Sequence, residues 1–172
     1  MLDYRKHISP PLINIISFPK LRLHGEIIDY NVQLTPDMEL NLPPIFENEV
    51  EIKQVLLNLI LNACDVMLNV APQQRRLVIV TSSDDSKNIM VTVRDTGTGI
   101  NETELECIFD QFYTTKHEGL GMGLSISQRI MPAHGGRIWA SNNSDGGAMF
   151  SFTLPISYAE GCRVNTEQFF CC

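Results

Sequence analysis

A chain of 172 residues, 44% of them hydrophobic, is long enough to fold as one domain with a full core. Its formal net charge of −7, without any run of basic residues, argues against a nucleic-acid partner, which needs a concentrated positive surface. The five cysteines have neither the pairing nor the histidine partners of a zinc site. With no secretion signal and no apolar run of membrane-spanning length, we expect a cytoplasmic location without membrane insertion.

The two ends of the chain differ from its middle. Residues 1–29 contain three prolines and mixed polarity, so we expect them to be a truncated remnant of an upstream helix and linker. Residues 30–156 carry the periodic segments and are expected to form one domain, beginning with short strands at residues 31–35 and 44–47. Residues 157–172 are expected to be a disordered tail.

The first long element is a predicted helix over residues 49–69, in which apolar residues recur at helical spacing. A second stripe along this helix is polar and consists of Gln54, Asn58, Asn62, Asp65 and Asn69. A solvated face is the simplest interpretation of such a stripe, for Asp65 and Asn69 in particular. Asparagine lowers helix propensity, however, so two asparagines one turn apart within an apolar run need another reason. An amide oxygen that projects from a helix can ligate Mg²⁺, which prefers hard oxygen ligands.

A predicted hairpin follows, with strands at residues 77–82 and 89–94. Period-two alternation places Asp95 on the same face as Val91 and Val93, which is the face expected to be buried. A buried carboxylate is costly unless a hydrogen-bond donor meets it, and the amino group of adenine is such a donor.

Glycines follow this carboxylate closely. Gly97 and Gly99 would let a planar ring approach the backbone, because no side chain stands in the way. The alternative is a simple turn after a strand, which Asp95 caps and in which the glycines adopt positive φ.

The next segments are a short helix and two loops. Asn101 and Glu104 predict a capping box for a helix that ends at Phe109. Residues 109–116 then combine aromatic side chains, two hydroxyls and a lysine, and a packed helix end followed by a loop is the plain alternative. Residues 119–123 are rich in glycine, and the exposed amides where such a loop enters a helix attract phosphate, although a flexible connector is also possible.

The last predicted elements are a helix over residues 124–134 and strands at residues 137–141 and 148–154. Gly135 and its neighbouring glycine are expected to stop the helix. Pro132 lies in its last turn and is expected to kink or shorten it, because proline cannot donate a backbone hydrogen bond.

In this order, these segments resemble the catalytic, ATP-binding domain of sensor histidine kinases, which are members of the GHKL ATPase superfamily. Residues 54–63 are similar to the N box, 95–100 to the first glycine box, 109–116 to the F box and 119–124 to the second glycine box. The amino-acid sequence of the F box is most similar to that of the nitrogen-regulation and oxygen-sensing branch of this family. The resemblance implies an α+β fold, a two-layer α/β sandwich (Bergerat or GHKL fold) with helices over one mixed, mostly antiparallel sheet.

The resemblance also implies ATP and Mg²⁺ as cofactors and assigns roles by motif. Asn62 is the implied Mg²⁺ ligand, Asp95 the acceptor for the adenine amino group, and Lys116 the contact that stabilises charge on the outer phosphates. Asn58 is implied as catalytic together with Lys116; it stands where related ATPases carry a glutamate that activates water, and asparagine cannot act as that base. Further implied nucleotide contacts are Asn58, Asp65, Gly97, Gly99, Ile100, Phe112, Thr114, Thr115, Gly119, Leu120, Gly121, Gly123 and Leu124.

Three side chains in or near these motifs are expected to be structural. The resemblance implies a lid that the glycines of residues 119–123 allow to close over the phosphates. It suggests that Phe109 and Phe112 act as packing anchors for this lid, and that His134 has no part in catalysis.

The implied activity is transfer of the γ-phosphoryl group of ATP to a histidine on a dimerisation domain, with a response regulator downstream and a homodimeric full-length protein. We expect the acceptor domain to be absent from this chain, because the surroundings of His7 do not match an acceptor motif. The rival interpretation is a non-catalytic nucleotide-binding regulatory module, against which Asn62, Asp95, Lys116 and the lid glycines argue. A hydrolase of the same superfamily is disfavoured by the missing carboxylate at position 58.

Overall fold

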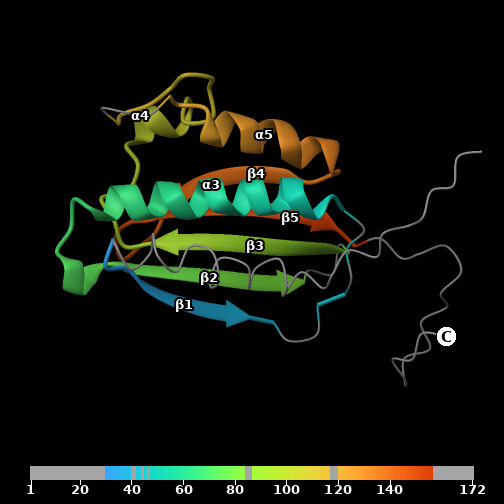
Figure 1. The fold of residues 1–172 in the computed structure, drawn as a ribbon, viewed down its shortest axis with the longest axis horizontal. Coiled ribbons are helices and arrows are strands. Elements are labelled where there is room, and N and C mark those ends of the chain that lie inside the picture. The colour runs from blue at the N-terminus through green and yellow to red at the C-terminus, as the bar shows by residue number, and fades with distance from the viewer. Residues whose placement is uncertain are drawn as a thin grey trace, which may run out of the picture.

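The computed structural model describes residues 30–39, 42–43, 45, 47–83, 87–116 and 120–156 (Figure 1). These residues form one five-stranded sheet in the order β1-β2-β3-β5-β4. The strands are β1 (Gln33–Met38), β2 (Arg76–Ser83), β3 (Asn88–Asp95), β4 (Arg137–Asn142) and β5 (Ala148–Pro155). The pair β1–β2 is parallel and the other three pairs are antiparallel, so the sheet is mixed and mostly antiparallel, as expected.

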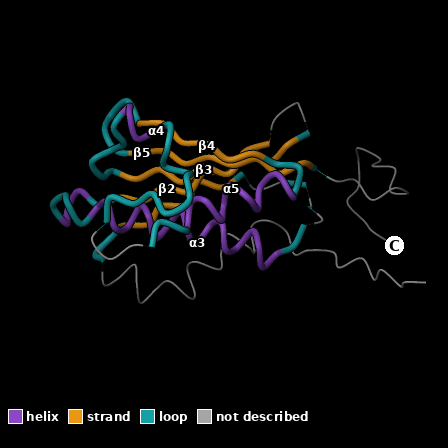
Figure 2. Tube along the Cα trace, turned by 90° about the horizontal axis from the view of Figure 1, so that it is seen from above, coloured by secondary structure: helices purple, strands orange, loops and turns teal. Residues whose placement is uncertain are grey.

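Two helices cover one face of this sheet. They are α3 (Glu49–Met67) and α5 (Gly123–Ala133), and Figure 2 shows them side by side on the same side of the strands. The shorter elements are the 3-10 turn η1 (Pro72–Gln74) and the helix α4 (Glu102–Leu105). This arrangement confirms the predicted two-layer α/β sandwich.

The core lies between α3 and the sheet. Asn48 caps the start of helix α3, since its side chain accepts a hydrogen bond from the amide of Val50 at 3.1 Å. The apolar stripe of the helix is buried. That stripe consists of Ile52, Val55, Leu56, Leu59, Ile60, Ala63, Cys64 and Met67. Burying each large aliphatic side chain contributes about 1.5–3 kcal/mol to folding, which fixes the rotation of the helix. The polar stripe is thereby held along the side of α3 that faces α5 and the loop before it.

Several element boundaries differ from the prediction. Strand β1 lies at Gln33–Met38 rather than at residues 31–35. The strand expected at residues 44–47 is wrong, since Ile45 and Glu47, the described residues of that segment, lie outside any strand. The one proline of this segment, at position 44, cannot donate to a sheet, and Ile45 instead buries its side chain completely in the core.

The helix ends differ in smaller ways. Helix α3 stops at Met67, two residues before its predicted end, and α4 ends at Leu105 although its predicted capping box is present. Helix α5 runs through Pro132 to Ala133. The helix thus ends one residue after Pro132 and one residue before its predicted end at residue 134. Proline lacks the donor for its own i−4 bond, but almost no helix follows it that could be kinked. Among the described residues, none of the helices combines the length and hydropathy that a bilayer span requires.

A histidine at the end of α5 ties this helix to the start of α3. The ring nitrogen Nδ1 of His134 contacts the carboxylate of Glu47, and Nε2 contacts Glu51 at 2.6 Å. Burial alone lowers the pKa of His134, but the hydrogen bonds and negative charge of Glu47 and Glu51 outweigh burial and raise the pKa above its ordinary value of 6.5. The charged imidazolium thus clamps the two helices together.

His134→Gln is expected to lower the free energy of unfolding by about 1–3 kcal/mol in mildly acidic solution, because charge-assisted hydrogen bonds are lost. Since the pKa is raised in the folded state, this stabilisation is complete below the unfolded value of 6.5 and is lost as the pH rises through the folded-state pKa. Thermal unfolding of both proteins across a pH series measures the difference. A difference that does not shrink with rising pH would contradict the clamp.

Candidate functional site

Asp95 is a buried carboxylate at the end of β3, with only 1% of its surface exposed. Its Oδ1 accepts hydrogen bonds from the amides of Gly97 at 2.8 Å and Ala148 at 3.2 Å. Its Oδ2 is buried and has no hydrogen-bond partner among the described residues. Burial raises the pKa of Asp95, and the two backbone hydrogen bonds oppose that rise. Such an acceptor calls for a donor supplied by a ligand, because a buried polar atom without a partner is costly.

The loop after Asp95 packs closely on α3. A Cβ atom at Gly97 would lie 2.8 Å from Cγ2 of Val66 and 3.0 Å from Oδ1 of Asp95, so position 97 has no room for a side chain. Gly99 has a φ of 76°, a conformation that glycine adopts at little cost. The predicted residues Asp95, Gly97, Gly99 and Ile100 therefore form one short, tightly packed loop beside α3.

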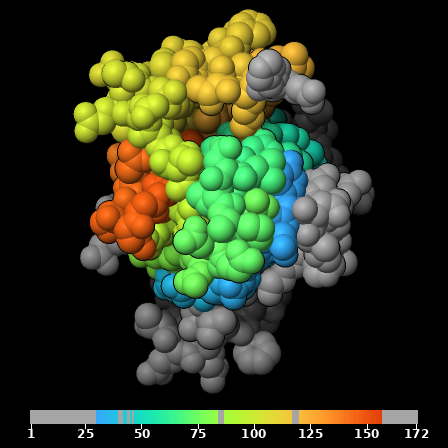
Figure 3. Space-filling model, turned by 90° about the vertical axis from the view of Figure 1, so that its left-hand side faces the viewer, coloured from blue at the N-terminus to red at the C-terminus, as the bar shows by residue number. Residues whose placement is uncertain are grey.

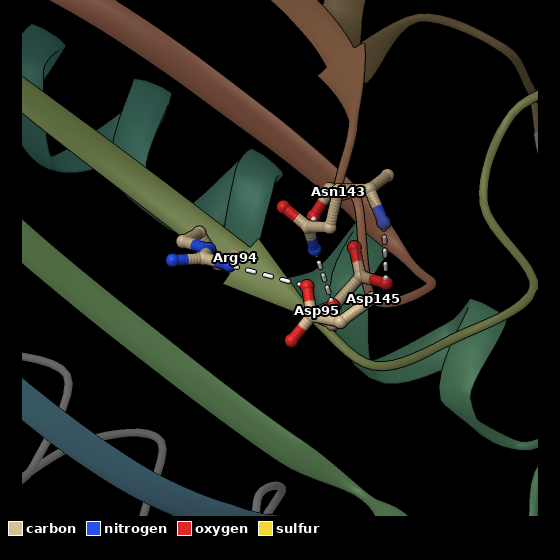
Figure 4. A network of polar contacts seen from close by, with 5 residues as sticks. Arg94, Asp95, Asn143 and Asp145 are labelled. Carbon is tan, nitrogen blue, oxygen red and sulfur yellow. Dashed lines mark hydrogen bonds and ion pairs between the residues drawn. The ribbon is translucent and has the colours of Figure 1, made fainter.

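Two asparagines, the last residue of β4 and the residue after it, hold this loop, and neither belongs to a predicted motif. Asn142 makes hydrogen bonds to both backbone groups of Ile100, at 2.8 Å and 2.7 Å. The side chain of Asn143 lies against the end of β3 and donates to the carbonyl of Asp95 at 2.9 Å (Figure 4). The only signal in the sequence is that both asparagines precede the Ser-Asp-Gly-Gly turn between β4 and β5.

Asn58 connects α3 to the start of α5. Its Nδ2 donates to the carbonyl of Gly123 at 2.9 Å and to Oγ of Ser127 at 3.2 Å, while its Oδ1 accepts from Gln54 at 2.8 Å. The whole amide is therefore engaged. In this structure Asn58 positions the first turn of α5, where the second glycine box enters the helix.

Lys116 reaches the polar face of α3 one turn further along. Its Nζ donates to Oδ1 of Asn62 at 2.8 Å and to Oδ2 of Asp65 at 2.5 Å. Tyr30 donates to the other carboxylate oxygen of Asp65 at 2.8 Å. The expectation that Asp65 is merely a solvated position is wrong, because it joins Lys116 to Tyr30, whereas Asn69 is exposed as expected.

The oxygens of Asn62 and Asp65 are suited to a cation, since they converge on an ammonium group here. Both are hard oxygen donors of the type that Mg²⁺ prefers. The described residues contain no group of three or more acidic, histidine or cysteine side chains that could hold a metal alone. A magnesium ion at this place would consequently need further ligands from a bound phosphate and from water.

The loop over this site is folded back on itself. Phe112 has a φ of 67°, and its amide donates to the carbonyl of Gly121 at 3.2 Å. A Cβ atom at Gly121 would lie 2.6 Å from the carbonyl carbon of Phe112, so only glycine allows this approach. Figure 3 views this end of the molecule, where the segment around α4 (yellow-green) lies above both the end of α3 (green) and the β4–β5 turn (orange-red).

The aromatic residues of this loop differ in burial. Phe109 packs edge-on against Phe150, with 6.5 Å between the ring centroids, so it is an anchor. Phe112 is 72% exposed, and its expected anchoring role is wrong because the positive φ turns its side chain outward. Leu120 is exposed as well.

The remaining predicted contacts lie in or near this loop. Thr114 and Thr115 are exposed, and Oγ1 of Thr114 accepts from the amide of Lys116 at 3.1 Å. Leu124 is half-buried against the core. Gly119 lies outside the described residues.

Comparison with known proteins places the chain among ATPases. Residues 47–158 match the family described as "Histidine kinase-, DNA gyrase B-, and HSP90-like ATPase". The chain is 43% identical over 130 residues to the sensor protein FixL of Bradyrhizobium diazoefficiens, an alignment that covers 75% of this chain and 25% of FixL. The chain therefore spans about a quarter of the length of that relative.

Solved structures agree with the sequence comparison. The nucleotide-free catalytic domain of the histidine kinase ThkA superposes with a TM-score of 0.75 at 30% identity, covering 86% of this chain and 93% of that one. ThkA in complex with the response regulator TrrA superposes with a TM-score of 0.71 at 28% identity, covering 86% of this chain and 41% of that one.

Proposed function

Because the chain belongs to the family of histidine kinase-, DNA gyrase B- and HSP90-like ATPases, we propose that it is the catalytic domain of a sensor histidine kinase. It would transfer the γ-phosphoryl group of ATP to a histidine on a dimerisation domain outside this chain. One observation carries the proposal: Oδ2 of Asp95 is a buried acceptor without a partner among the described residues. The amino group of adenine supplies the missing donor, whereas the carbonyl of guanine would repel the carboxylate.

The other predicted site residues would have complementary roles. Gly97, Gly99 and Ile100 would lie beside the base. Asn62 would hold Mg²⁺, which would neutralise charge on the phosphates. Lys116 would leave the oxygens of Asn62 and Asp65 and move to the outer phosphates, where a positive charge stabilises phosphoryl transfer.

The lid residues would bind the phosphates and close the site. Thr114 and Thr115 offer hydroxyls, and Gly119, Gly121 and Gly123 allow backbone amides to approach. Leu120, Phe112 and Leu124 would line this lid. Asn58 has no base to offer for water attack, and its contacts with Gly123 and Ser127 support a role in keeping the start of α5 in place.

The partners follow from the relatives. A histidine-bearing dimerisation domain would present the acceptor, in cis within a full-length homodimer or in trans. A response regulator would receive the phosphoryl group, which the similarity to ThkA in its complex with TrrA supports. The domain would work in the cytoplasm.

The test is phosphotransfer in trans. With radiolabelled ATP, Mg²⁺ and a histidine-bearing dimerisation domain, we expect acid-labile, alkali-stable label on the dimerisation domain and none on this chain. Lys116→Ala should slow the transfer about a hundredfold to a thousandfold, because a preorganised charge at the transferring group is lost, and Asn69→Ala should not. ATP binding without any transfer would favour the non-catalytic module, and label on the isolated chain would show an acceptor within it.

A further inference from the structure

We propose that Asn142 and Asn143 are positioning residues, which fix the loop of residues 95–100 and thereby set the affinity and base selectivity of the site. The inference rests on the proposed function, since this loop is taken to contact adenine. It concerns the opposite side of the loop from α3, where the β4–β5 turn lies.

Asn142 holds the far end of the loop. Its Oδ1 accepts from the amide of Ile100 at 2.8 Å, and its Nδ2 donates to the carbonyl of the same residue at 2.7 Å. One primary amide thus pairs with both backbone groups of one residue, in the way that a neighbouring strand would. A Cβ atom at Gly99 would lie 3.0 Å from Oδ1 of Asn142, so the glycine makes room for this pairing.

Asn143 holds the near end of the loop. Its Nδ2 donates to the carbonyl of Asp95 at 2.9 Å and to that of Ala148 at 3.1 Å, so both of its amide hydrogens are used. The amide of Ala148 in turn donates to Oδ1 of Asp95 at 3.2 Å. Asn143 therefore holds Ala148 close to Asp95. In this position the amide of Ala148 occupies Oδ1 of Asp95, and Oδ2 is left for a ligand.

The β4–β5 turn, which these asparagines precede and begin, packs directly on the loop. Gly147 is buried, and a Cβ atom there would lie 2.1 Å from the carbonyl oxygen of Asp95. The loop cannot shift on that side unless the turn shifts too.

The β4–β5 turn is closed mainly by its backbone, to which the side chain of Asn143 adds one bond, the one to Ala148. The backbone bonds run from the amide of Asn143 to Gly147 at 2.9 Å and from the amide of Gly146 to Asn143 at 3.3 Å. The side chain of Asn142 is directed wholly to Ile100, and that of Asn143 bridges to Asp95. These contacts preorganise the loop, and preorganisation raises affinity because less freedom is lost on binding.

The experiment compares Asn142→Ala and Asn143→Ala with Asp145→Ala, a control from the same turn. Asp145 is exposed and makes a surface ion pair with Arg94 at 3.5 Å (Figure 4), a type of contact that contributes little. Calorimetry would measure binding of ATP and of ITP, whose base carries a carbonyl where adenine has its amino group. Hydrogen exchange would follow the amides of Gly97 and Ile100 without nucleotide.

Each asparagine variant should bind ATP about tenfold more weakly, which corresponds to ~1.4 kcal/mol. ITP, which does not use the acceptor on Asp95, should bind as it does to the wild type, so the ATP-to-ITP ratio falls. The amide of Ile100 should exchange faster in Asn142→Ala. Asp145→Ala should change none of these quantities.

A second variant at position 142 separates loss of positioning from a general loss of folding. Asn142→Asp has nearly the same shape and keeps the acceptor for the amide of Ile100, but it sets a carboxylate oxygen against the carbonyl of that residue. It should lose selectivity as Asn142→Ala does. Wild-type selectivity in this variant, or equal losses of ATP and ITP binding, would overturn the positioning role. Absence of ATP binding by the wild type would instead overturn the proposed function.

Discussion

Asp95→Asn is expected to weaken ATP binding about tenfold to a hundredfold, because a hydrogen bond to a charged acceptor contributes about 1.5–3 kcal/mol. The structure also determines how the new amide must point. The amides of Gly97 and Ala148 both donate to Oδ1, so the asparagine oxygen takes that position. Its NH₂ group then replaces Oδ2 and faces the amino group of adenine, and two donors oppose each other.

The same geometry predicts a change of base preference. The NH₂ group of Asp95→Asn can donate to the carbonyl of ITP, so the variant should gain ITP affinity while it loses ATP affinity. Calorimetry with both nucleotides measures the exchange. If ATP remained the preferred ligand with unchanged affinity, Asp95 would not be the adenine contact.

The wild-type protein should also lose ATP affinity in acid. Protonation removes the charged acceptor, and burial raises the pKa of Asp95 above its ordinary range, so affinity falls as the pH decreases through that raised pKa. Asp95→Asn has no such group and should not show this loss.

Asn62→Ala should abolish the higher affinity for Mg²⁺-ATP than for metal-free ATP. Loss of a partner at a metal site typically lowers metal affinity about tenfold to a hundredfold, and we expect an effect of that size. The reason is that the variant lacks the amide oxygen that would ligate the ion. Asn62 also accepts from Lys116 at 2.8 Å, so the informative quantity is the ratio of affinities with and without Mg²⁺ rather than either value alone.

Asn69→Ala is the matched control for this experiment. Asn69 belongs to the same polar stripe of the sequence, but it lies beyond the end of α3 and is exposed. Its replacement should leave the ratio unchanged. Equal behaviour of the two variants would mean that Asn62 is no ligand.

The spacing of apolar residues predicted the features of the structure that depend on residues close together in the sequence. The helical spacing of apolar residues gave α3 and its polar face, and strand alternation placed Asp95 among the buried residues, as found. Both patterns report which side of an element packs on the core. They therefore locate the faces on which the candidate site lies.

These patterns could not predict the contacts between residues that are far apart in the sequence. Asn142 and Ile100 are 42 positions apart, and Lys116 and Asn62 are 54 apart, so these pairs exist only once the sheet and lid have formed. The outward direction of Phe112 depends on a positive φ that its aromatic character does not suggest. A sequence pattern contains residue types and spacing, whereas these features depend on tertiary geometry.

The contact of Lys116 with Asn62 and Asp65 has a consequence for the end of the catalytic cycle. The lysine is tethered to the chain, so its ammonium competes for these oxygens at a high effective concentration. If the domain transfers phosphate as proposed, the product ADP has lost the γ-phosphate, and that competition would favour its departure. In the proposed cycle, the residue that would stabilise the transferring group would thus also act as an intramolecular displacer that resets the domain.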